Sequence, residues 1–152
     1  MDKRRTYQLS LWLVISLVAV ACRKSEVNTN RLSKQGEWQV TELTVGTNVH
    51  SALPRWDIGE APDDKEFATA IWKHSTGSTA PFLWRFNYYE GTFSFLIDPH
   101  EASDETSKAY IQCDNLSGEY NILTDKRKLF EFESIETKGY GTVTVFIRLE
   151  PY

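Results

Sequence analysis

Two cysteines and three histidines are the side chains with the widest chemical range in this sequence. A catalytic thiol needs a nearby histidine and surroundings that favour the thiolate, and nothing close to Cys113 in the sequence supplies them. His50, His74 and His100 are far apart and belong to no His-x-x-x-His or Cys-x-x-Cys pattern, the spacings typical of metal sites. We therefore expect no catalytic residue, no metal and no cofactor, and we expect Cys113 to be a small buried side chain.

Acidic side chains gather in one polar segment, from Asp98 to Ser107. Carboxylates in one loop can bind calcium weakly, but these lack the ordered ligand spacing of a calcium loop. A glycosidase would need a pair of carboxylates that stands out from the rest, and no pair does so here. A solvated loop is the simpler interpretation, and the sequence favours a protein that is not an enzyme.

Cys22 stands at the end of a secretory pattern. A basic start at residues 3–5 precedes an uncharged apolar run, residues 9–21, which ends in the small residue Ala21. This run is shorter than the ~20 residues that cross a bilayer. The arrangement resembles the lipobox of bacterial lipoproteins, which implies a signal peptide over residues 1–21 and a lipid on Cys22. An ordinary cleaved signal and an uncleaved anchor are the alternatives.

The resemblance to lipoproteins also implies a cellular location. A lipid-anchored protein of the bacterial cell envelope has the membrane as its first partner. Arg23 follows the cysteine, in place of the aspartate that retains some lipoproteins in the inner membrane, and no acidic run follows it. We therefore expect the outer membrane, in its periplasmic leaflet. The net charge of −4 argues against nucleic acid and against a polybasic membrane binder.

The segment after the signal divides into a tether and one domain. Residues 22–33 are polar and have little to bury, so we expect a flexible tether. Residues 34–152 are long enough for a single domain with a core. In this domain, short segments of alternating apolar and polar residues predict β-strands joined by turns. The predicted strands span residues 36–45, 82–89, 92–97, 109–113, 118–123, 130–133 and 142–149, with an eighth within residues 51–58.

Two details of this pattern carry more information than the rest. The strands on either side of Glu90-Gly91 form the clearest hairpin. In the first strand the apolar parity changes near Thr41-Glu42, which predicts a bulge. Consecutive hairpins form a meander, and closing about eight strands removes the exposed edges. The predicted fold is an all-β, up-and-down antiparallel barrel.

The segment from Gly46 to Ala80 is long for a connection between strands. Phe67, Ile71 and His74 lie at helical spacing, and Asp63 or Asp64 can cap a helix there. We therefore predict a short helix over residues 63–74, inside the long connection between the first two strands.

Gly36 and Trp38 open the first strand, and Arg148 lies near the end of the last. This combination resembles the Gly-x-Trp motif of lipocalins and the basic residue that lies across its tryptophan. The resemblance implies a lipocalin-like barrel, a guanidinium stacked on the indole of Trp38, and a long first connection that acts as a lid. In layout it covers most of residues 32–152. Trp38 as an ordinary core residue is the alternative.

Aromatic residues give the main positive signal for a binding site, because the chain holds five Trp, seven Tyr and eight Phe. Binding sites are concave, mostly apolar and common in barrel mouths. We therefore predict a cup for a small hydrophobic or amphipathic ligand. Its candidate residues are Trp84, Phe86, Tyr88, Phe93 and Phe95, with Trp56 and Trp72 on the long connection as a lid. The alternative is a barrel filled by its own side chains that docks a protein partner on its outer surface.

Overall fold

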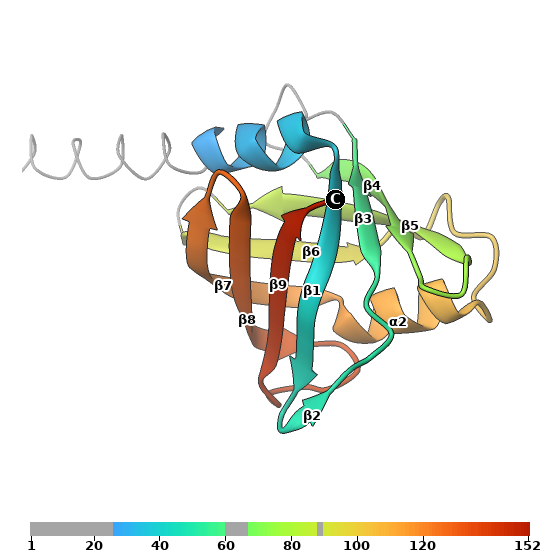
Figure 1. Cartoon of the computed structure of the whole chain (residues 1–152). Helices are drawn as coiled ribbons and strands as arrows, with labels where there is room; N and C mark the ends of the chain where they lie inside the picture. Colours follow the sequence, from blue (N-terminus) through green and yellow to red (C-terminus); the bar gives the residue numbers. More distant parts are fainter. Residues whose placement is uncertain (1–25, 60–66, 88–89) are drawn as a thin grey trace, which may run out of the picture.

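The computed structural model describes residues 26–59, 67–87 and 90–152. In these residues one antiparallel sheet has the order β2-β1-β3-β4-β5-β6-β7-β8-β9, and β1 also pairs with β9. This last pairing closes the sheet into an eight-stranded barrel, with β2 as a short extension beside β1 (Figure 1). The strands are β1 (Glu37–Val45), β2 (Asn48–Val49), β3 (Arg55–Ile58), β4 (Ala68–Lys73), β5 (Thr79–Phe86), β6 (Thr92–Ile97), β7 (Gly118–Lys126), β8 (Leu129–Thr137) and β9 (Val145–Pro151). The predicted all-β barrel is confirmed.

The hairpin predicted around Gly91 is formed by β5 and β6. Trp84 pairs with Phe95 and Phe86 pairs with Phe93, so the aromatic residues of both strands share one face. That face points into the barrel, because alternate residues of a strand lie on opposite sides of the sheet and all four of these side chains are buried. Gly91 has a φ of 70°, a conformation that favours glycine.

The bulge predicted in the first strand is also present. The register between β1 and β9 shifts between Val40 and Glu42. Because of this shift, Trp38 and Val40, which precede the bulge, and Leu43 and Val45, which follow it, all point into the core. A regular strand could not bury both pairs, because their parity is opposite.

The helix predicted over residues 63–74 is wrong. Residues 60–66 lie outside the described part, and residues 68–73 form β4, in which Ala68, Ala70 and Trp72 are buried while Ile71 faces outward. This segment fits both a helical spacing and the alternation of a strand. It forms a strand because β4 pairs with β3 on one edge and with β5 on the other. The described residues of the supposed long connection therefore contribute β2, β3 and β4 to the sheet.

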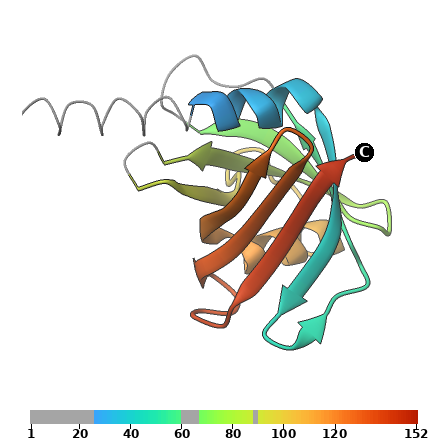
Figure 2. The same ribbon diagram turned by 60° about the vertical axis from the view of Figure 1, so that its left-hand side comes forward.

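The flexible tether expected over residues 22–33 is wrong for its described part, because residues 26–35 form a helix. Leu32 of this helix is fully buried in the barrel core. Asn28 donates a hydrogen bond from Nδ2 to Asp125 Oδ2 at 3.2 Å, and Arg31 donates to the backbone carbonyl of Asp125. Figures 1 and 2 show this N-terminal helix, in blue, lying across one end of the barrel.

A second helix, α2 (Lys108–Leu116), replaces the strand predicted at residues 109–113. Ser107 caps it by accepting a hydrogen bond from the backbone N–H of Tyr110. Ala109, Cys113 and Leu116 are buried at helical spacing, and α2 lies away from the N-terminal helix, toward the other end of the barrel (Figure 1). Among the described residues, no helix is long and apolar enough to cross a membrane.

Candidate functional site

The aromatic residues predicted to line a ligand cup do converge inside the barrel. They come from four neighbouring strands, because Trp56 lies on β3, Trp72 on β4, and the others on β5 and β6. Trp56 and Trp72 are Cα partners across β3 and β4, so they belong to the barrel wall and not to a lid. Tyr88 lies outside the described residues. The structure thus brings together the six described candidates: Trp56, Trp72, Trp84, Phe86, Phe93 and Phe95.

These rings pack against one another and leave no open cup between them. Trp56 lies 5.4 Å from Trp72 and 5.5 Å from Phe95, measured between ring centroids. Phe93 lies 5.1 Å from Phe86. Distances of this size are those at which aromatic pairs attract each other.

Exposure shows how completely the rings fill this space. Trp56, Trp72, Trp84 and Phe93 have 0% exposure, and Phe95 has 1%. A ring that borders a space large enough for a water molecule would have accessible surface on that side. These rings have essentially none, so no such space lies beside them, and they form a core.

Further residues complete this aromatic core. Phe132 stacks on Phe93 with 4.5 Å between centroids, and Tyr120 stacks on Phe95 with 5.4 Å. Alternation along strands β7 and β8 places both on the inner face, and this signal was present in the sequence. Gln112 had no such signal, because it lies on α2, where a strand was predicted; its Oε1 accepts a hydrogen bond from Trp72 Nε1 at 3.0 Å.

The buried indole N–H groups are not all paired. Trp38 Nε1 donates to the backbone carbonyl of Leu32 at 2.9 Å, and Trp72 is held by Gln112. Trp56 and Trp84 are fully buried, and within the described part of the chain their Nε1 atoms have no hydrogen-bond partner. Unpaired buried donors are uncommon and cost free energy.

Trp38 lies inside the barrel at the start of β1, but Arg148 does not lie across it. Gly36 has a φ of 76°, which suits glycine at the start of β1. Trp38 is fully buried and lies opposite Pro151 on β9. Arg148 lies opposite Glu42 on the outer face, between the inward-facing Ile147 and Leu149.

The guanidinium of Arg148 therefore does not stack on Trp38. Its ion-pair partners are Glu131, Glu150 and Glu42, at 3.5, 3.4 and 3.7 Å. The interior partner of Trp38 is Phe130, whose ring meets the indole edge-on at 5.4 Å. The stacking implied by the motif is wrong because the two side chains lie on opposite faces of the sheet.

The titratable side chains do not form a reactive cluster among the described residues. Cys113 is fully buried, and this burial raises the pKa of its thiol well above the ordinary value. His74 bonds Thr76 within an exposed turn, and burial lowers its pKa. No group of three or more metal-binding side chains occurs in residues 26–59, 67–87 and 90–152. Cys22 lies outside these ranges.

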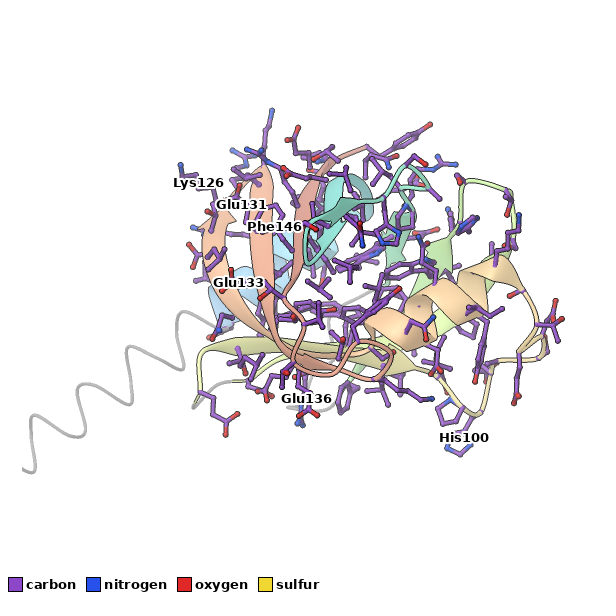
Figure 3. The ribbon with its side chains drawn as sticks, turned by 90° about the horizontal axis from the view of Figure 1, so that it is seen from below. His100, Lys126, Glu131, Glu133, Glu136 and Phe146 are labelled. Carbon is purple, nitrogen blue, oxygen red and sulfur yellow. The ribbon has the colours of Figure 1, made fainter. Side chains whose placement is uncertain are left out.

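The outer surface carries the other features of interest. An open groove of about 610 Å³ runs over β6, β7 and β8, and Leu96, Glu119, Ile135 and Lys138 contribute to its lining. Beside it, Phe146 on β9 pairs with Glu133 on β8. Figure 3 shows Glu131, Glu133 and Phe146 on these two strands, with His100 far from them. This surface combines apolar and acidic side chains.

Comparison with known proteins identifies the fold. No protein-family model and no curated protein matches the sequence. The structure is similar to the crystal structure of a lipocalin-like protein from Bacteroides uniformis ATCC 8492, with a TM-score of 0.50 and 12% sequence identity. The match covers 80% of this chain and 99% of the other. At this identity the similarity establishes a lipocalin-like fold and nothing finer.

Proposed function

We propose that this chain is a lipid-anchored protein of the bacterial cell envelope whose lipocalin-like barrel is a non-catalytic docking module. The observation that supports the docking role is the filled interior. Trp56, Trp72, Trp84 and Phe93 have no exposed surface, so recognition takes place on the outer surface of the barrel. The same residues that suggested a ligand cup supply the rigid core of the module.

The lipid anchor rests on the sequence around Cys22. Acylation would add about 0.8 kcal/mol of membrane affinity per buried CH₂, and two or more chains give a stable anchor. The proposed location is the periplasmic leaflet of the outer membrane, because Arg23 follows Cys22 and no acidic run follows it. The non-catalytic role is supported by the burial of Cys113, whose thiol lies within the core.

A ligand inside the barrel is the second candidate function, and one observation favours it. The indole N–H groups of Trp56 and Trp84 have no acceptor among the described residues. A small amphipathic molecule with an oxygen acceptor would satisfy them. Such a molecule can enter only if the rings move apart, because the barrel interior beside them has no free space.

Two experiments test the proposal. Cells that express the protein are grown with radioactive palmitate, and the purified product is compared with the Cys22→Ser variant. We expect label in the parent and none in the variant; an unlabelled parent would overturn the anchor. Separately, the folded protein is titrated with 1-anilinonaphthalene-8-sulfonate, which fluoresces in apolar cavities. A filled barrel gives little signal, whereas saturable binding that Trp84→Phe changes would favour the second candidate.

A further inference from the structure

The N-terminal helix fixes which end of the barrel faces the membrane. This step rests on the proposed lipid at Cys22. Three residues separate Cys22 from Glu26, the first described residue of the helix, and the four Cα–Cα steps from Cys22 to Glu26 span at most about 14 Å. The helix lies across one end of the barrel and is bonded to it through Leu32, Asn28 and Arg31. The lipid therefore holds this end close to the bilayer, and we call it the anchor end.

The anchor end also carries a basic turn. Lys126, Arg127 and Lys128 join β7 to β8 and are all exposed. Asn28 and Arg31 bond the preceding residue, Asp125, so the turn lies beside the helix. Figures 1 and 2 show the β7–β8 turn next to the blue helix, while β2 and the β8–β9 connection lie at the opposite end. Lys126 projects away from the barrel in Figure 3.

The outward face of the helix adds to this surface. Val27, Asn30 and Lys34 lie at helical spacing and are exposed, whereas Asn28 and Leu32 are buried on the other side. Lys34 contributes a fourth exposed cation. Glu26 is the exposed acid on the described part of this helix.

The distribution of charge matters more than its sum here. The chain has a net charge of −4, yet residues 126–128 are three consecutive cations, the one such run in the described part of the chain. Anionic lipid headgroups attract basic side chains within about a Debye length, ~8 Å at physiological ionic strength. A lipid anchor at the same end keeps these cations near that distance.

We propose that Lys126, Arg127 and Lys128 form a second membrane contact that binds anionic lipid headgroups. The contact orients the barrel with its anchor end on the bilayer. The opposite end, with β2, then faces away from the membrane and is free for a partner.

The test uses the lipidated protein purified from cells and reconstituted into vesicles. A fluorophore is attached to a new cysteine at one end in each variant: Val27→Cys at the anchor end, where Val27 is 39% exposed, or Val49→Cys at the opposite end, where Val49 is 77% exposed. Cys113 is fully buried and does not react while the protein is folded, and the sulfur of Cys22 is blocked by its lipid. Lipids that carry a quencher in the headgroup region report the distance of each probe from the bilayer.

On vesicles of phosphatidylglycerol and phosphatidylethanolamine, we expect strong quenching at position 27 and weak quenching at position 49. Neutral phosphatidylcholine vesicles, or high salt, should reduce the quenching at the anchor end, although the lipid still holds this end nearer to the bilayer than the opposite end. Lys126→Glu with Lys128→Glu should do the same, whereas Lys108→Glu on α2, also exposed, should not. Asn30→Cys, at another exposed position of the helix, provides a second labelling site that leaves all three cations in place.

Two outcomes would overturn the inference, and the proposed anchor is judged separately. Equal quenching at both ends, or quenching that does not depend on phosphatidylglycerol, would contradict the second contact. The intact mass of the same preparation reports the acyl chains. Acyl chains with equal quenching leave the anchor standing and the second contact wrong, whereas a mass without acyl chains overturns both.

Discussion

The indole N–H of Trp38 donates a hydrogen bond to the backbone carbonyl of Leu32 at 2.9 Å, which joins the N-terminal helix to the first strand of the barrel. Both side chains are fully buried. The end of the barrel near Trp38 is therefore closed by the protein's own preceding segment and not by Arg148. The helix belongs to the folded domain, and the domain begins earlier than the sequence suggested.

The first prediction concerns this helix. Leu32→Ala removes a fully buried side chain from the core, and such changes cost about 2–5 kcal/mol. Urea unfolding should show a loss in this range. The matched control is Lys34→Ala on the exposed side of the same helix, where the change should stay within about 0.5 kcal/mol. Equal, small effects at both positions would mean that the helix does not pack on the barrel in solution.

The second prediction tests the filled interior. Trp84→Ala should reduce the free energy of unfolding by about 3–5 kcal/mol and leave an apolar cavity. Cavities of about 150 Å³ bind benzene, so benzene should stabilise the variant through binding to the folded state. The parent and the control Leu123→Ala, at an exposed position, should show no such stabilisation. Benzene binding to the parent with similar affinity would indicate a pre-existing cavity.

The third prediction is a pH dependence that comes from Cys113. Burial raises the pKa of its thiol well above the ordinary value of 9.0. Below that value the thiol is protonated in both states; above it the unfolded chain loses the proton and the folded chain keeps it. Stability is therefore lost as the pH rises through this range, by up to about 1.4 kcal/mol per pH unit for one group.

The measurement for this pH effect is urea unfolding between about pH 8 and about pH 10, compared with Cys113→Ala. The variant should lose less stability over this range, whatever its stability at the start. Parallel curves for the two proteins would contradict a buried, protonated thiol. Tyr120, whose pKa is raised by burial and by the neighbouring Cys113, contributes only as the pH approaches its ordinary value of 10.0, at the upper end of this range.

The fourth prediction separates Arg148 from the role implied by the motif. Its side chain is 37% exposed and forms its ion pairs with carboxylates on the outer face. Arg148→Ala should therefore cost no more than about 1 kcal/mol, and high salt should reduce this difference by screening the ion pairs. A salt-independent loss as large as that of Leu32→Ala would indicate that Arg148 supports the core around Trp38.

Much of the fold could be predicted from the alternation of apolar and polar residues and from the residues typical of turns. Phe82, Trp84 and Phe86 alternate with Leu83 and Arg85, and no helical pattern competes with this one, so the hairpin was predicted correctly. In residues 67–74 two patterns compete, since Phe67, Ile71 and His74 fit a helix while Ala68, Ala70 and Trp72 fit a strand. Pairing with β3 and β5 decides the outcome, and no local feature of the sequence reveals that pairing.

Whether the barrel interior is filled or hollow could not be predicted from the sequence, for a different reason. Period-two patterns showed which rings point inward, but not how much space they share. That space depends on how rings from different strands interlock, as Phe93 does with Phe132 from β8. The expected stacking of Arg148 on Trp38 was wrong because a sequence motif does not specify how two strands are aligned. In the pairing of β1 with β9, Pro151 lies opposite Trp38.

Native mass spectrometry of the protein purified from its own cells tests the central claim most directly. If the barrel is a filled docking module, the native mass should equal the mass of the denatured chain, with no bound small molecule. A further small molecule that leaves only on unfolding, and that Trp84→Phe loses, would contradict the claim and show that the barrel opens for a ligand.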